Sequence, residues 1–379
     1  MRYPRFVKKG DTIGFPSPSF SPAIEPYKTA FNHSLTKWQE HGHNTLLGSN
    51  CYLNEGLGIC NLPSKCAAEL MDMYTGKEAD ALISCGGGEM MCEILPYMDF
   101  DALAKAEPKW FMGYSDNTNF TFLSATLMDT AAIYGPCAAS FGMEPIHPSI
   151  SDAYNLLCGR KLSFSGYEKW EKEGFDSDED PLAGINDTEP SVIRIFDPAR
   201  FDNTDLYCKN EASEANPFLI KDEFGRPIGV KDRYPDADSI SMKGRLLGGC
   251  MDCLVTFLGT SFDKVKEFNN RYKEDGVIWF LEACDLNVFS IRRAMWQMRN
   301  AGWFENCKGF IIGRPMHFDE GMMGLDRIYA VMDIIGDLKV PVLMDADIGH
   351  LPPMIPLIVG SMAEVTADTN GYNISMSLK

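Results

Sequence analysis

The sequence predicts an α/β protein in which helices cover mainly parallel sheets. Short apolar runs of strand length alternate with segments whose apolar residues recur every three or four positions, as in amphipathic helices. The alternation occurs over residues 1–150 and again over residues 241–379, and residues 151–240 between them are acidic and rich in turn signals. Strands that alternate with helices pair as a parallel sheet. We therefore predict an N-terminal α/β domain, an acidic connection that could form a lid, and a C-terminal domain.

The N-terminal segment is expected to contain four strands and four helices. Each predicted strand is a short apolar run, and residues 79–85 are stopped by Gly86-Gly87-Gly88. The first helix is predicted from Ile24, Tyr27, Phe31, Leu35 and Trp38, at spacings of three and four. The predicted strands are 12–16, 44–47, 79–85 and 109–113, and the predicted helices are 23–40, 63–74, 89–95 and 116–128.

The central stretch is the most acidic part of the chain. Residues 166–240 contain 19 Asp or Glu against 9 Lys or Arg, together with several X-Pro turn signals. Two interpretations stay open: a solvated connection, or a loop that closes over a site, because long irregular connections are often functional. Trp170 or Tyr167 could stack there on a flat substrate, although local packing is the commoner role of such aromatics.

The C-terminal segment returns to the alternating pattern. Strands are predicted at 242–247, 276–281, 307–313 and 340–344, and helices at 288–300 and 326–335. Gly248-Gly249 is expected to open a further helix that runs to Leu258. The tail 363–378 alternates in hydrophobicity around Asn370-Gly371, which predicts an edge hairpin.

Charge and composition exclude several classes of function. The 35 Lys and Arg against 53 Asp and Glu give a net charge of −18, which would repel nucleic acid and anionic membranes. A small basic substrate remains possible, because one pocket can differ from the whole. No apolar stretch is long enough to span a bilayer, and the first residues do not resemble a secretory signal. We therefore expect a cytoplasmic protein with free thiols.

The cysteines and histidines give no recognisable metal signature. Cys250-Met-Asp-Cys253 is the one C-x-x-C among the 12 cysteines, and it lacks a second ligand pair or a thioredoxin-like context. The sequence contains no H-E-x-x-H either. We expect buried packing cysteines, no metal and no cofactor.

Ser115 is the strongest candidate for a catalytic residue. It lies where a predicted strand turns directly into a helix, so that free backbone N–H groups could stabilise an anion beside its hydroxyl. The position is like a hydrolase nucleophile elbow, although G-x-S-x-G is not met. The alternative is that Ser115 or Asp116 only caps the helix.

Three further features could complete a site. Gly86-Gly87-Gly88 could turn backbone N–H groups toward a ligand, or could be a plain tight turn. Glu282 ends an apolar strand, and His350 lies in a Gly- and Pro-rich loop after another. Ser115, Glu282 and His350 supply a nucleophile, a carboxylate to orient a base, and the base, but spacing cannot show that they meet.

These segments also resemble a known family. The chain resembles the LD-carboxypeptidase family of serine peptidases, and within it the branch of the microcin C self-immunity hydrolases. The matching segments, which cover most of the chain outside 166–240, are 9–14, Gly87-Gly88, 94–97 with Asp99, 113–118, 134–136, 244–249, 280–282, 309–313 and 347–350 with Pro353.

The resemblance implies roles for individual residues. Ser115 would be the nucleophile, His350 the general base and then acid, and Glu282 the group that orients His350. The N–H groups of Gly88 and Asp116 would form the oxyanion hole, with Gly87 beside them. The active site would lie in the cleft between a Rossmann-like N-terminal domain and a smaller, β-rich C-terminal domain.

The resemblance also implies the chemistry and the partners. Family members are typically metal-free homodimers. Their substrates are the L,D-peptide bonds of murein stem peptides, or the amide or acyl-phosphoramidate bonds of peptidyl and aminoacyl nucleotides. One departure bears on specificity: Glu89-Met90 stands where relatives of the microcin branch often carry Asn.

Two alternatives are weighed against a serine hydrolase. One is a non-catalytic protein that binds a small ligand on the same two-domain scaffold. The other is a cysteine hydrolase that uses Cys85, Cys92 or Cys284, none of which lies on a strand-to-helix elbow. A histidine base predicts a rate that rises as His350 loses its proton, near a pKa of about 6.5 before any shift.

Overall fold

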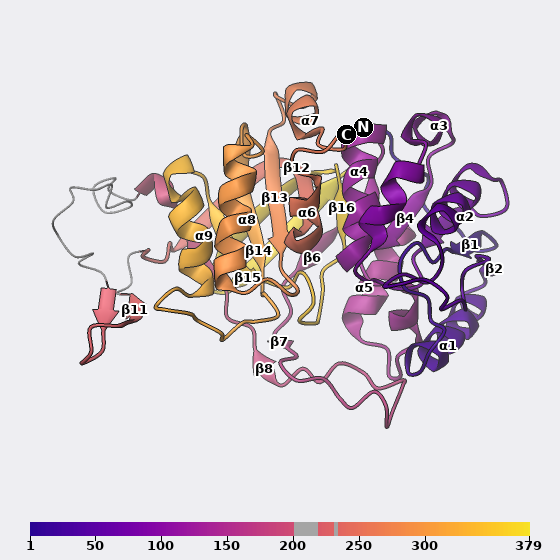
Figure 1. Cartoon of the computed structure of the whole chain (residues 1–379), viewed down its shortest axis with the longest axis horizontal. Helices are drawn as coiled ribbons and strands as arrows, with labels where there is room; N and C mark the ends of the chain where they lie inside the picture. The colour runs from indigo at the N-terminus through magenta and orange to yellow at the C-terminus, as the bar shows by residue number, and fades with distance from the viewer. Residues whose placement is uncertain (201–218, 231–233) are drawn as a thin grey trace.

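The computed structural model describes residues 1–200, 219–230 and 234–379. Two sheets lie side by side, and helices cover them (Figure 1). The predicted α/β class is confirmed. Figure 1 also shows the two chain ends next to each other, where the Tyr3 hydroxyl donates to the backbone carbonyl of Lys379 at 2.8 Å. None of the described helices is both long enough and apolar enough to cross a lipid bilayer.

The first sheet has the strand order β16-β5-β4-β3-β1-β2. All neighbours are parallel except β16, which returns from the end of the chain and pairs antiparallel with β5. Its strands are β1 (Thr12–Phe15), β2 (Asn44–Leu47), β3 (Ala81–Ile83), β4 (Trp110–Gly113), β5 (Ala132–Tyr134) and β16 (Leu357–Val359). The helices of this half are α1 (Tyr27–Glu40), α2 (Pro63–Thr75), α3 (Phe100–Lys105), α4 (Thr118–Met128) and α5 (Pro148–Leu157), with short 3-10 helices η1 (Met91–Tyr97), η2 (Ser115–Asn117) and η3 (Ala138–Gly142).

The second sheet has the order β6-β18-β17-β12-β13-β14-β15-β9. Strands β12 to β15 are parallel, and antiparallel strands extend the sheet on both sides. Its strands are β6 (Ser163–Ser165), β9 (Arg194–Phe196), β12 (Ser239–Cys250), β13 (Val277–Glu282), β14 (Cys307–Gly313), β15 (Val342–Ala346), β17 (Met362–Asp368) and β18 (Gly371–Ser377). The helices of this half are α6 (Met251–Phe257), α7 (Val265–Arg271), α8 (Val288–Asn300) and α9 (Arg327–Ile335), with η4 (Pro198–Arg200) and η5 (Gly336–Leu338).

The predicted connection 151–240 takes part in this second sheet. It begins within α5, contributes β6 and β9, and forms two small ribbons, β7 (Lys169–Trp170) with β8 (Glu189–Pro190) and β10 (Leu219–Lys221) with β11 (Pro227–Val230). The part of the predicted lid at 201–218 and 231–233 lies outside the described residues. The division of the chain into 1–150, 151–240 and 241–379 stays a prediction.

Several predicted elements differ from the structure for local reasons. The first helix begins at Tyr27 and not at residue 23, because Pro26 disfavours helical backbone in the residue before it. Residues 91–97 form a 3-10 helix where an α-helix was expected, and Pro96 inside it lacks a backbone donor. The tail hairpin is not at the edge, because β6 covers β18. Strand β5 and helices α3 and α5 were not predicted.

The prediction that Gly248-Gly249 opens a helix is wrong. Strand β12 continues through both glycines to Cys250, and α6 begins at Met251. A Cβ on Gly248 would lie 1.7 Å from the carbonyl oxygen of Phe280, and one on Gly249 would lie 2.7 Å from Thr118. The glycines therefore let β12 approach both β13 and α4 closely.

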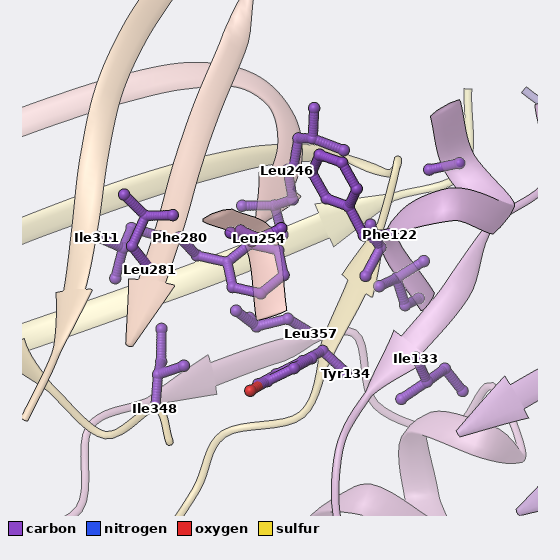
Figure 2. Close-up of a cluster of buried hydrophobic side chains, with 14 of the residues drawn as sticks. Phe122, Ile133, Tyr134, Leu246, Leu254, Phe280, Leu281, Ile311, Ile348 and Leu357 are labelled. Carbon is purple, nitrogen blue, oxygen red and sulfur yellow. The ribbon is translucent and has the colours of Figure 1, made fainter. Parts of the chain in front are cut away.

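An apolar cluster joins the two sheets (Figure 2). Phe122 of α4, Ile133 of β5 and Leu357 of β16 come from the first half, and Leu246 and Phe280 come from the second. All five are essentially inaccessible to solvent. This packing holds β5 of the first half against β13 of the second, so that one site can be built from both halves.

Candidate active site

Ser115, His350 and Glu282 meet at the junction of the two sheets. His350 Nε2 lies 2.9 Å from Ser115 Oγ, and His350 Nδ1 lies 2.8 Å from Glu282 Oε2. Because a carboxylate only accepts hydrogen bonds, Nδ1 carries the proton, and in the neutral ring Nε2 can accept from the serine hydroxyl. The three residues thus form a hydrogen-bonded chain of nucleophile, base and carboxylate.

Ser115 is the first residue of η2, on the sharp turn that follows β4. Its φ of 61° places a non-glycine residue in the left-handed region, a conformation that costs about 1–3 kcal/mol and that gathers at functional sites. Its N–H donates to the hydroxyl of Tyr134 at 3.3 Å. The turn therefore presents the hydroxyl of Ser115 while its backbone is held from the neighbouring strand.

Glu282 ends β13 and is fully buried. Its second oxygen, Oε1, accepts from the Tyr134 hydroxyl. Burial alone would raise the pKa of Glu282, but the facing His350 and the hydrogen bonds from Tyr134 and Cys250 lower it below its ordinary value. The carboxylate therefore stays charged, as an orienting group must.

His350 lies in the loop that follows β15. Burial opposes the charged ring, but Glu282 and, after it, Cys284 outweigh the effect of burial, so the pKa of His350 is raised well above its ordinary value. The loop is anchored three residues earlier by Asp347, which accepts from the buried Arg314 guanidinium, from the Tyr372 hydroxyl at 2.8 Å and from the Tyr167 N–H at 2.8 Å.

The glycine run lies against the serine. A Cβ on Gly87 would be 3.2 Å from Ser115 Cβ, so only glycine permits this approach without displacement. The Gly87 carbonyl accepts from the Phe20 N–H at 2.9 Å. Because C=O and N–H of one trans peptide point in opposite directions, the Gly88 N–H is turned away from Phe20. Its part in an oxyanion hole stays a prediction, as does that of the Asp116 N–H.

The Asp116 side chain is occupied with holding the turn. Its carboxylate accepts from the Ser19 hydroxyl, from the Met91 N–H at 2.9 Å and from Asn119 Nδ2 at 3.0 Å. Burial raises its pKa, and these hydrogen bonds counteract the rise. Asp116 therefore ties the Ser115 turn to the loops that precede α1 and η1.

A cavity of about 430 Å³ opens beside the serine. The polar part of its lining includes Ser115 and Gly87 from the first half and His350 from the second. The apolar part includes Phe20 and Ile24 from the loop before α1 and Tyr27 at the start of α1, all of them partly exposed. The site therefore lies in a cleft to which both halves contribute. An apolar wall next to a polar centre is typical of small-molecule sites.

Trp170 and Tyr167, which could have stacked on a substrate, do not line this cavity. Trp170 is buried between Phe318, at 5.1 Å between ring centroids, and the Arg314 guanidinium, at 5.2 Å from its ring. The Tyr167 hydroxyl donates to Asp152 at 3.0 Å. Local packing, the alternative interpretation, is what the structure shows for both.

The cysteines surround the site, and one of them, Cys284, helps to raise the pKa of His350. Burial raises the pKa of Cys85 and of Cys92, which disfavours their thiolates. Cys284 lines the cavity near His350, whose Nε2 faces Ser115. Cys250 and Cys253 are buried, and hydrogen bonding and burial raise the pKa of Cys250 well above its ordinary value. All the cysteines in the described ranges are free thiols.

One group of potential metal ligands occurs in the part of the chain that the structure describes. Cys250, Glu282 and His350 offer ligand atoms within 4.8 Å of one another. Glu282 and His350 are already hydrogen-bonded to each other in this group.

Sequence reasoning missed Tyr134 and Asp347 as site residues. Tyr134 contacts both Ser115 and Glu282, and Asp347 fixes the loop that carries His350. Both residues lie inside segments that carried the family resemblance, 134–136 and 347–350, and only this resemblance could have identified them as site residues.

The chain is similar to known proteins over nearly its whole length. The model of the LD-carboxypeptidase N-terminal domain matches residues 13–135, and that of the C-terminal domain matches residues 243–365. The chain is 25% identical to the microcin C7 self-immunity protein MccF of Escherichia coli, over 97% of this chain and 93% of that protein. It is 22% identical to a "Probable murein peptide carboxypeptidase" of Bacillus subtilis, over 95% of this chain and 90% of that protein. A solved structure of MccF in complex with aspartyl sulfamoyl adenosine has a TM-score of 0.72, with 19% identity, and covers 99% of this chain and 98% of that one.

Proposed function

Because the chain belongs to the LD-carboxypeptidase family of serine peptidases, and is therefore a hydrolase, we propose that Ser115, His350 and Glu282 are its catalytic triad. The observation that carries the proposal is the continuous hydrogen-bonded chain from Ser115 Oγ through the imidazole to the buried carboxylate. A serine hydroxyl is a weak nucleophile until an adjacent base takes its proton, and this chain supplies the base and its orienting group.

The proposed reaction proceeds through an acyl-enzyme. Ser115 Oγ attacks the scissile carbonyl carbon while His350 Nε2 takes the hydroxyl proton. The N–H groups of Gly88 and Asp116 would stabilise the negative oxygen of the tetrahedral intermediate. His350 then gives its proton to the leaving nitrogen as the C–N bond breaks. A water molecule, deprotonated by the same nitrogen, releases the acyl group and restores Ser115.

Two substrate classes suit this chemistry. The relatives include a protein named for murein peptides and a structure that holds an aminoacyl sulfamoyl nucleoside. The apolar and aromatic wall of the large cavity, with Phe20 and Tyr27, supports a flat group such as a nucleoside in that place. We therefore propose an amide or L,D-peptide bond as the target, with the aminoacyl nucleotide as the favoured class.

The nucleophile is tested by a pair of variants. Ser115→Ala should reduce turnover by at least about 10³-fold, because it removes the attacking oxygen, while the melting temperature changes little. Cys284→Ala, a change of similar size in the same cavity, should retain turnover within about tenfold of the wild type. Loss of turnover in Cys284→Ala but not in Ser115→Ala would instead favour the cysteine hydrolase.

The substrate class is tested by two parallel incubations. Mass spectrometry would follow release of D-Ala from a murein tetrapeptide and release of the nucleoside from aspartyl sulfamoyl adenosine, with Ser115→Ala as the control. Release of D-Ala alone would assign the peptide class, and release of the nucleoside alone would assign the nucleotide class. Binding without cleavage of either compound would favour the non-catalytic alternative.

A homodimer and a cytoplasmic location stay predictions from the family resemblance. Light scattering on the purified chain would measure the mass of the assembly. Fractionation of the cells that express it would locate the protein.

A further inference from the structure

Tyr114, the residue before the proposed nucleophile, packs against the imidazole of His350. The centroids of the two rings are 5.1 Å apart, and the ring planes are inclined at 49°. Aromatic rings attract one another in tilted and edge-to-face arrangements at centroid distances of roughly 4.5–7 Å. The imidazole is therefore held at Nδ1 by Glu282, at Nε2 by Ser115 and against its ring by Tyr114.

Tyr114 is itself fixed by neighbours outside the triad. Its ring lies edge-on to that of Tyr134, with 6.5 Å between the centroids and 89° between the planes. Its backbone oxygen accepts from the N–H of Asn117 at 3.2 Å and from Asn117 Nδ2 at 3.0 Å. Tyr134 and Asn117 are both completely buried. None of these contacts involves an atom that changes its bonding in the proposed reaction, so the Tyr114 ring is a fixed surface throughout it.

One of the three contacts of His350 is lost halfway through the proposed reaction. In the free enzyme the Ser115 hydroxyl donates to Nε2, but in the acyl-enzyme Ser115 Oγ is esterified and has no proton to donate. Glu282 is then the only hydrogen-bond partner of the ring within the triad, and the χ2 torsion of a histidine has only broad preferences of its own. Nε2 must nevertheless point at the attacking water, because it takes a proton from that water. The ring therefore needs a contact that does not depend on Ser115 Oγ.

We propose that Tyr114 is a positioning residue, which keeps the imidazole of His350 aligned while the acyl-enzyme is hydrolysed. The inference rests on the proposed function and deepens it. In that step the water oxygen bonds to the acyl carbon while Nε2 takes a proton from the water. The bond between the acyl carbon and Ser115 Oγ then breaks, and Oγ takes the proton from Nε2. Tyr114 forms no bond in either event and acts only through the place of the ring.

The test separates the two halves of the reaction in Tyr114→Leu, which removes the ring but keeps an apolar side chain. The variant and the wild type are each mixed with saturating aspartyl sulfamoyl adenosine and, in parallel, with a murein tetrapeptide, and the reactions are quenched in acid. Intact-protein mass spectrometry measures the fraction of chains that carry the acyl group. The turnover number divided by this fraction gives the rate constant of deacylation, and divided by the remaining fraction it gives that of acylation.

We expect the rate constant of deacylation to fall by at least about tenfold in Tyr114→Leu, because a small misplacement of a general base is costly in rate. Acylation should slow by about threefold or less, since the Ser115 hydroxyl still holds Nε2 in that step. Tyr114→Phe retains the ring and should keep both rate constants within about threefold of the wild type. Unchanged deacylation in Tyr114→Leu, an equal fall in both steps, or a Tyr114→Phe variant as slow as Tyr114→Leu would overturn the proposal.

Tyr154→Leu is the matched control. The Tyr154 ring stacks on His41, with 4.4 Å between the centroids and 23° between the planes, and neither residue lines the cavity beside Ser115. The control therefore removes a tyrosine ring from a histidine outside the site. Both rate constants should stay within about threefold of the wild type, whatever the change in melting temperature. If Tyr154→Leu slows deacylation as much as Tyr114→Leu does, the effect is one of general stability and the proposal is overturned.

A second measurement does not depend on the folding of Tyr114→Leu. Ser115→Ala lacks the hydroxyl that donates to Nε2, and so imitates the loss of this contact in the acyl-enzyme. In protein labelled so that only His and Tyr side chains carry protons, nuclear Overhauser effects should connect the His350 and Tyr114 rings in Ser115→Ala as in the wild type. Loss of these signals in Ser115→Ala would mean that Tyr114 does not hold the ring without the serine, and would overturn the proposal.

Failure of this inference is distinguishable from failure of the proposed function. If the wild type cleaves either compound and Ser115→Ala does not, while Tyr114→Leu deacylates at the wild-type rate, the triad is supported and the positioning role is overturned. If the wild type cleaves neither compound, the proposed function is overturned together with the inference.

Discussion

The hydroxyl of Tyr134 donates a hydrogen bond to Glu282, and so connects the last residue of β5 in the first sheet with the last residue of β13 in the second. Both side chains are fully buried, and the Tyr134 ring packs in the apolar cluster that joins the sheets (Figure 2). The same hydroxyl accepts from the N–H of Ser115. One side chain therefore positions both ends of the proposed triad.

Tyr134→Phe tests this positioning role. The variant leaves a buried carboxylate oxygen of Glu282 without its donor, an effect worth about 1–3 kcal/mol. We expect kcat/KM to fall by about ten- to a hundredfold and the chain to remain folded, as measured by steady-state kinetics and thermal melting. Tyr154→Phe is the control. It loses a hydrogen bond of 3.0 Å to His43, which is not part of the triad, and it should affect stability only. An unchanged rate in Tyr134→Phe would contradict the role.

The pH dependence of the rate follows from the pairing of His350 with Glu282. His350 acts as a base only when it is neutral, and its pKa is raised well above the ordinary value. The rising limb of kcat/KM against pH should therefore have its midpoint above about 6.5. A profile that is flat between pH 5 and 9 would argue against a histidine base.

Glu282→Gln separates the charge of this residue from its shape. Without the carboxylate, the pKa of His350 should fall, so the rising limb moves toward lower pH while its plateau drops by about 10²-fold or more. The pairing of His350 with Glu282 also makes the stability of the fold depend on pH. The raised pKa of His350 stabilises the wild type below about pH 6.5, and this contribution is lost as the pH rises through the folded-state value. Melting temperatures of the two proteins should therefore converge at alkaline pH.

The site also depends on the ion pair between Arg314 and Asp347, which anchors the loop that carries His350. Arg314 and Asp347 are both at least 98% buried and form an ion pair. Arg314→Met leaves the Asp347 charge without its partner, which typically costs about 3–5 kcal/mol of unfolding free energy. Urea denaturation would measure the loss. The control is Arg226→Met, which breaks an exposed pair with Asp222 and should cost less than about 1 kcal/mol. Similar losses in both variants would contradict the role of burial.

The strands and helices were largely predictable, whereas the meeting of the site residues was not. Strand β13 is six consecutive buried residues, and an apolar run of that kind is visible in sequence. Ser115 and His350 are 235 residues apart, and their contact depends on how the two sheets pack at Phe280 and Leu357. Local spacing carries no information about such packing, so the family resemblance alone linked the two.

Other features depended on tertiary contacts in the same way. The low strand and helix propensity of glycine predicts a break at Gly248-Gly249, yet β12 continues through the pair. Glycine is required at residue 248 because the neighbouring β13 leaves no room for a side chain. Trp170 follows Glu168 and Lys169 in an acidic stretch of the sequence, yet it is buried and packs on Phe318 from far along the chain. In each case the decisive neighbour is distant in sequence.

Gly248→Ala tests whether this close approach supports the site. The added Cβ would meet the Phe280 carbonyl, two residues before Glu282, and the φ of 153° is itself unfavourable for alanine. We expect a loss of at least about 3 kcal/mol in unfolding free energy, because the clash with backbone adds to the cost of the conformation. Gly259→Ala is the matched control. It also has a positive φ, of 80°, but nothing lies within 4 Å of its added Cβ, so it should cost only about 1–2 kcal/mol. If both variants lose the same free energy, the strand contact is not what requires glycine at residue 248. If Gly248→Ala folds with its full kcat/KM, the position of Glu282 does not depend on this contact.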